Sequence, residues 1–88
     1  MPADGAAALQ ALAECLRHLA CGYGLDPRER GACIANLEAG ILGVADADLA
    51  AVAKLLQVRR RLTCRQRAQA SELSVRLAAL AESLRSRS

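Results

Sequence analysis

Apolar side chains recur along this chain at intervals of three and four residues, the spacing that places them on one face of an α-helix. The pattern occurs four times and predicts helices over about residues 5–21, 27–42, 47–62 and 64–84. The first two apolar stripes consist of Leu9, Leu12, Leu16 and Leu19, and of Ile34, Leu37, Ile41 and Val44. We therefore predict a single all-α domain, either an antiparallel helical hairpin or a small three- to four-helix bundle.

Two helix starts carry the residues of a capping box. Asp26 precedes Pro27, and Glu29 follows Asp26 by three residues, which predicts a helix that begins at the proline. Thr63 and Gln66 have the same spacing. This second pair indicates either a new helix near residue 63 or one helix that runs straight through it.

Two other helix ends have weaker signals. Asp46 stands directly before the third apolar stripe and is expected to cap that helix. The Ser/Arg tail that begins at Ser83 is expected to fray, because terminal residues without apolar contacts are seldom ordered.

The composition favours helices that pack closely against each other. The chain has one Tyr, no Phe and no Trp, against twenty Ala and fifteen Leu in 88 residues, whereas strands favour β-branched and aromatic residues. A core this short and without large rings is marginally stable, so we expect a protein partner or a homo-oligomer. The sequence predicts a cytoplasmic protein, because its first residues are acidic and no apolar run approaches the roughly 18 residues that span a bilayer.

Charge divides the chain into two halves. Residues 1–48 carry a net charge of −4 and residues 49–88 a net charge of +7. The basic patch consists of Arg59, Arg60, Arg61, Arg65 and Arg67. Such a block can meet nucleic acid phosphates, an acidic protein or the chain's own acidic half. On a helix these residues spread over more than one face, so we expect any binding of nucleic acid to be weak.

The cysteines and the one histidine do not form a recognisable metal site. Cys15, His18 and Cys21 would lie on one helix with the outer pair about 120° apart, while Cys33 and Cys64 stand alone. We expect all four cysteines to pack as small apolar side chains, with no metal and no cofactor, and His18 to lie on the surface.

Catalysis also lacks a recognisable constellation. The single histidine has only Glu14 as an acidic neighbour at helical spacing, which is an ordinary helix pair. The acids Asp46 and Asp48 stand at a helix start, where the helix dipole favours negative charge. We therefore expect that the protein is not an enzyme.

One family resemblance extends from residue 6 to residue 44. It consists of Leu12-Ala13-Glu14-Cys15, Arg17, Leu19-Ala20, Gly22, Leu37-Glu38, Gly40 and Leu42-Gly43. These residues resemble the small co-chaperones of bacterial type III secretion systems. The resemblance implies a short helical hairpin that joins a tetratricopeptide-like chaperone and keeps the needle subunit unpolymerised in the cytoplasm. The basic segment after residue 46 is absent from the typical short member.

A second resemblance covers residues 34–58. The pattern Ile34-x-x-Leu37-Glu38-x-Gly40-x-x-x-Val44-x-Asp46-x-x-Leu49-x-x-Val52-Ala53-Lys54-x-Leu56-x-Val58 is similar to the second half of a Cro/C1-type helix-turn-helix domain. It implies a DNA-associated transcriptional regulator. The segment from Asp26 to Cys33 is too short for both a second helix and the turn before a recognition helix, so the motif would be degenerate.

The sequence thus predicts a small cytoplasmic interaction protein, with a co-chaperone role in type III secretion as its most specific form and the DNA-associated regulator as the alternative. Four apolar stripes in so short a chain indicate surface that is left for a partner helix. The partner-binding residues expected from the stripes are Leu9, Leu12, Leu16, Leu19, Ile34, Leu37 and Ile41.

Overall fold

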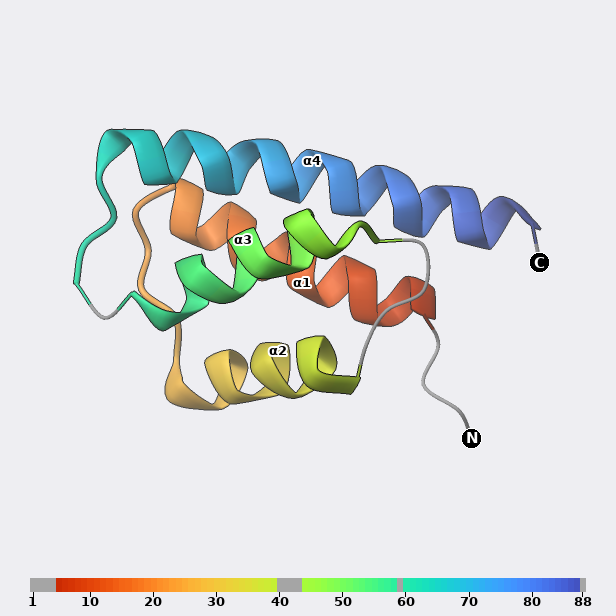
Figure 1. The fold of residues 1–88 in the computed structure, drawn as a ribbon, viewed down its shortest axis with the longest axis horizontal. Helices are drawn as coiled ribbons and strands as arrows, with labels where there is room; N and C mark the ends of the chain where they lie inside the picture. Colours follow the sequence, from red (N-terminus) through yellow and green to blue (C-terminus); the bar gives the residue numbers. More distant parts are fainter. Residues whose placement is uncertain (1–4, 40–43, 59, 88) are drawn as a thin grey trace.

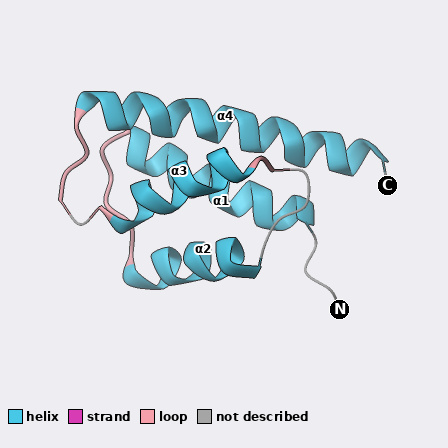
Figure 2. Cartoon of the chain, in the orientation of Figure 1, coloured by secondary structure: helices cyan, strands magenta, loops and turns pink. Residues whose placement is uncertain are grey.

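The computed structural model describes residues 5–39, 44–58 and 60–87. It contains four helices: α1 (Gly5–Ala20), α2 (Pro27–Ala39), α3 (Asp46–Gln57) and α4 (Cys64–Arg87). Consecutive helices run in opposite directions, and the long α4 returns along α1 (Figure 1). The elements in the described part of the chain are helices and their connecting loops, without strands (Figure 2). The prediction of an all-α small helical bundle is confirmed.

The core lies mainly between α1 and α4, which make most of the contacts between helices. The leucines of α1 are buried against α4, and α3 adds Val52, Leu55 and Leu56 from a third side. On α4, Ala70 and Ala81 are completely buried. Because an alanine has only one methyl group, helix axes approach closely at such positions, and the chain fills its core without aromatic rings. The contribution of α2 is smaller, with Cys33 as its buried core residue.

The third helix is shorter than predicted. It ends at Gln57 and not near residue 62, because the backbone at Val58 is extended, with φ of −70° and ψ of 120°. The chain then reverses direction before α4. Thr63 Oγ1 accepts a hydrogen bond from the Gln66 N–H at 3.1 Å, and Gln66 Oε1 accepts one from the Thr63 N–H at 2.9 Å. This reciprocal capping box starts α4 as a separate helix, so the two segments are not continuous.

Of the two other predicted helix starts, one is confirmed and one is not. Asp26 Oδ1 accepts a hydrogen bond from the Arg28 N–H at 3.2 Å, as expected for a cap before Pro27. Asp46 does not cap α3, because Ala45 occupies the N-cap and Asp46 is the first helical residue. Its carboxylate still lies in the first turn, where the helix dipole favours it. The expected end of the second helix, at residues 40–42, lies outside the described residues.

The Ser/Arg tail continues α4 to Arg87, contrary to the expectation that it frays. Leu84 packs against the core, which gives this last stretch an apolar contact. Ser86 Oγ donates a hydrogen bond to the Glu82 carbonyl at 3.0 Å, and Arg85 pairs with the Glu82 carboxylate at 3.7 Å. These contacts extend the helix beyond the last predicted residue, Leu84.

One buried polar contact joins the two central helices. Ser74 Oγ donates a hydrogen bond of 2.7 Å to the Ala13 carbonyl oxygen. We expect Ser74→Ala to lower the free energy of unfolding by about 1 kcal/mol relative to Ser83→Ala, the exposed control on the same helix, because the substitution removes this hydrogen bond. Urea titration followed by circular dichroism measures both variants. Equal stability of the two variants would contradict the contact.

No helix in the described part of the chain is both long enough and apolar enough to cross a bilayer.

Candidate functional site

The four leucines expected to contact a partner on the first helix belong to the chain's own core. Leu9 and Leu16 are 0% exposed, Leu12 is 1% exposed and Leu19 is 7% exposed. The other helices of the bundle cover these side chains, so they would meet a partner only if α1 left the bundle. Of the second stripe, Ile34 and Leu37 are partly buried, and Ile41 lies outside the described residues.

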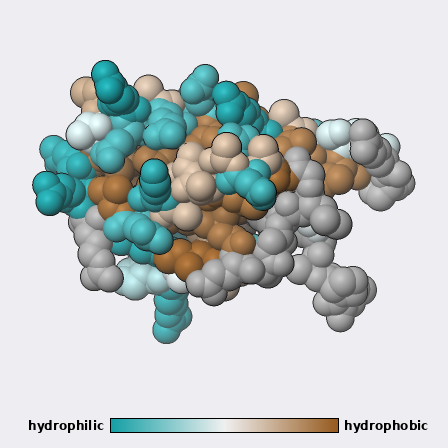
Figure 3. All heavy atoms as spheres, in the orientation of Figure 1, coloured by the Kyte–Doolittle hydropathy of each residue, from teal (hydrophilic) through white to brown (hydrophobic). Residues whose placement is uncertain are grey.

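An apolar groove lies between α2 and α3. It has a volume of about 310 Å³ and is lined by Ile34, Leu37, Leu49, Ala50, Ala53 and Gln57. Five of these six side chains are apolar. Figure 3 shows hydrophobic atoms gathered between the two helices on the face turned to the viewer. The groove is therefore an apolar surface that the described part of the chain leaves accessible to solvent.

Helical spacing explains why these side chains share one groove. On α2, Ile34 and Leu37 are three residues apart, and on α3, Leu49, Ala53 and Gln57 follow at intervals of four. Positions at these intervals lie on one face of a helix. The helices α2 and α3 run in opposite directions (Figure 1), and side chains of both faces line the same groove. Ala50 and Ala53 leave room for the backbone of another helix to approach.

Sequence reasoning found two groove residues, Ile34 and Leu37, and missed the contribution of α3. Leu49 lies on the third predicted helix, and in the structure its side chain is only partly buried. The periodicity gave the apolar face of that helix correctly. The periodicity could not show that α2 leaves part of this face uncovered.

The described arginines of the basic patch do not all line the same part of the surface. Arg60, Arg61, Arg65 and Arg67 are exposed, and Arg59 lies outside the described residues. Arg60, Arg61 and Arg67 line one hollow at the end of the bundle, whereas the side chain of Arg65 is not part of its lining. A fourth arginine of that hollow, Arg30 of α2, was not expected from the sequence.

The four cysteines differ in their exposure to solvent. Cys15 of α1 and Cys33 of α2 are buried, as expected for small apolar side chains, but Cys21 and Cys64 are exposed, which contradicts the expectation for these two. A hydrogen bond between the buried thiols lowers the pKa of Cys15. The same hydrogen bond, together with burial, raises the pKa of Cys33, so this thiol stays protonated. The pair contributes a polar contact between α1 and α2.

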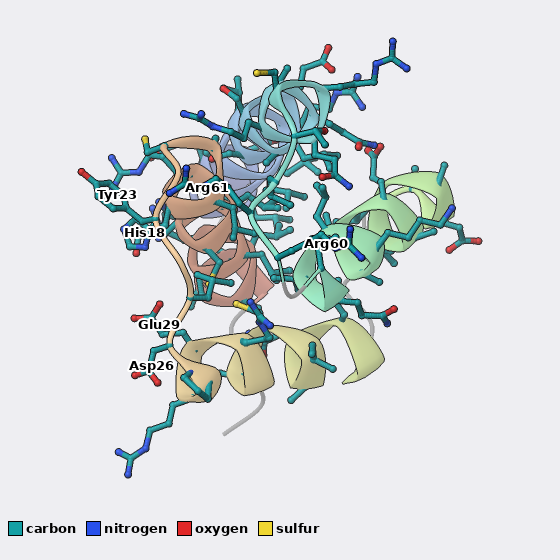
Figure 4. The ribbon with its side chains drawn as sticks, turned by 90° about the vertical axis from the view of Figure 1, so that its left-hand side faces the viewer. His18, Tyr23, Asp26, Glu29, Arg60 and Arg61 are labelled. Atoms are coloured by element: carbon teal, nitrogen blue, oxygen red, sulfur yellow. The ribbon has the colours of Figure 1, made fainter. Side chains whose placement is uncertain are left out.

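The described His, Cys, Asp and Glu residues were candidates for a metal site. Among the described residues, no group of three or more His, Cys, Asp or Glu side chains is placed to hold a metal ion. His18 is exposed, and its ring lies edge-on to that of Tyr23, with 6.4 Å between the ring centroids. The two side chains extend together from the end of α1 and the turn after it (Figure 4).

Comparison with known proteins gives no match: no family model fits the chain, and neither a curated protein nor a solved structure is significantly similar to it. The two family resemblances therefore stay predictions.

Proposed function

We propose that this chain is a protein-interaction module that binds an amphipathic helix of a partner protein in the groove between α2 and α3. The observation that carries the proposal is the contrast between two apolar stripes. The stripe on α1 is buried inside the bundle, whereas Ile34, Leu37 and Leu49 line an open groove. A groove of this kind is the surface that remains for a partner.

The chemistry of the groove favours a helix as its occupant. Helices that bind in grooves use apolar anchors at positions i, i+3 or i+4, and i+7. The leucine and isoleucine side chains that border the groove offer such anchors an apolar surface to pack against. Ala50 and Ala53 allow the partner helix to approach closely. Gln57 gives one end of the groove a polar group. The partner helix is expected to be amphipathic, with Leu or Ile on the face that enters the groove.

A co-chaperone role in a type III secretion system is the most specific form of this proposal. The resemblance of residues 6–44 to that family supports it, since the family joins a chaperone built from helical repeats. In that form, the helix in the groove would belong to a tetratricopeptide-like chaperone.

Site-specific photocrosslinking in cells of the source organism tests the proposal. A benzophenone amino acid replaces Ala53 in the groove or, as the matched control, the exposed Ala79 on α4. We expect one protein to form an adduct with the groove variant and not with the control, because only the groove holds the partner. Leu37→Asp is expected to abolish that adduct, since it puts a charge among the apolar anchors.

Three outcomes would contradict the proposal. The first is the same adduct at both positions, and the second is no adduct at the groove. The third is an adduct with a second copy of this chain, which would make the groove a self-association surface and not a site for a different protein.

A further inference from the structure

Four arginines from three segments of the chain surround one hollow at the end of the bundle. Arg30 comes from α2, Arg60 and Arg61 from the loop between α3 and α4, and Arg67 from α4. The hollow has a volume of about 340 Å³, and Tyr23 contributes to its wall. Figure 4 looks at this end of the molecule and labels Arg60, Arg61 and Tyr23.

The lining of this hollow carries positive charge without an acidic side chain among the described residues. Among the described residues, the ion pairs within 4.0 Å involve Arg76 and Arg85, and none of the four arginines of the hollow takes part in one. All four guanidinium groups stay charged at any physiological pH. Their mutual repulsion is relieved by an anion placed between them.

The hydrogen-bond donors of the hollow are also incompletely used. Arg67 Nε donates to the Ala20 carbonyl oxygen at 3.0 Å, which fixes the guanidinium and leaves its terminal N–H groups available. That group lies over Gly22, whose φ of +89° forms the turn after α1. Arg30 Nε is buried and has no hydrogen-bond partner among the described residues. A buried charged donor without a partner is costly, and the side chain to which it belongs lines the hollow.

We propose that the hollow binds an oligophosphate anion, with diphosphate as the simplest example. The planar fork of a guanidinium matches the oxygens of a phosphate, and four such groups can hold two linked phosphates from several sides. A hollow lined by arginines from separate segments fits a small anion better than a duplex, whose phosphates need a row of cations along a surface. This inference is independent of the partner groove.

Calorimetric titration of the full chain with sodium pyrophosphate, at about 150 mM salt, tests the site. We expect the wild-type chain to bind and Arg30→Gln and Arg60→Gln each to raise the Kd about tenfold, because each removes a charge-assisted hydrogen bond. Arg65→Gln is the matched control. It removes the same charge from an exposed residue outside the lining, and it is expected to change the Kd less than about twofold at this ionic strength.

Circular dichroism establishes that each variant retains the helical content of the wild-type chain. If Arg30→Gln loses helix, Arg60→Gln still decides the question, because Arg60 is exposed in a loop. Adenosine diphosphate replaces pyrophosphate in a second titration, and tighter binding there would support the site and assign it to an organic diphosphate. The absence of pyrophosphate binding at millimolar concentration would overturn the proposal. Equal losses for all three variants, or binding of a DNA duplex without binding of pyrophosphate, would overturn it as well.

Discussion

Replacement of Leu16 by aspartate is expected to unfold the isolated chain. Leu16 is 0% exposed and belongs to the core between α1 and α4. An unpaired carboxylate in such a place costs several kcal/mol. That cost is comparable with the few kcal/mol of net stability that a core of this size supplies. Far-UV circular dichroism and urea titration measure the loss of helix.

Leu37→Asp is the matched control for this prediction. Leu37 is a leucine on a neighbouring helix, but it is only partly buried and borders the groove, so this variant is expected to keep the fold. Wild-type helicity and a cooperative transition in Leu16→Asp would show that the α1 stripe is not the core. Unfolding of Leu37→Asp as well would show that the groove face of α2 is structural and not a surface for a partner.

The substitution Ala81→Leu is expected to have the second-largest effect. Ala81 is completely buried in the core on α4, and the added carbon atoms must displace its neighbours. Overpacking of this kind lowers the free energy of unfolding by about 1–3 kcal/mol. Ala79→Leu is the control, since it makes the same change at an exposed position of the same helix.

Urea titration compares the two alanine variants with the wild-type chain. We expect Ala79→Leu to lie within about 0.5 kcal/mol of wild type, because its side chain has room in solvent. Equal stability of the two variants would contradict the tight packing of α4 against the core at Ala81.

Periodicity predicted the four helices because each has to bury one apolar face. Leu9, Leu12 and Leu16 follow the helical interval, and that interval alone identifies their face. It does not say what covers the face. In the structure α4, whose own stripe was equally visible in the sequence, packs against these leucines within the same chain. Their contact with a partner stays a prediction.

Helix ends were predictable where side chains bond to the backbone. The Thr63 and Gln66 pair marks a start that the structure confirms. The end of α3 at Gln57 has no comparable signal, because the chain turns there to bring α4 back along α1, and this requirement comes from the tertiary fold. The extension of α4 beyond Leu84 also depends on the tertiary fold, because Leu84 packs against the core.

The arginine hollow could be predicted only in part. Arg60, Arg61 and Arg67 belong to one basic block that is visible in the sequence. Arg30 lies in the acidic half of the sequence, next to Glu29, and no local pattern connects it to that block. Only the packing of α2 beside the loop between α3 and α4 brings its side chain to the same hollow.

The central claim is that the groove between α2 and α3, and not the α1 stripe, is the apolar surface offered to a partner. Solvent paramagnetic relaxation of the leucine and isoleucine methyl groups tests this claim in the free chain. We predict strong relaxation for Ile34, Leu37 and Leu49, and weak relaxation for Leu9 and Leu16. Strong relaxation of the α1 methyl groups, or shielding of the three groove side chains, would contradict it.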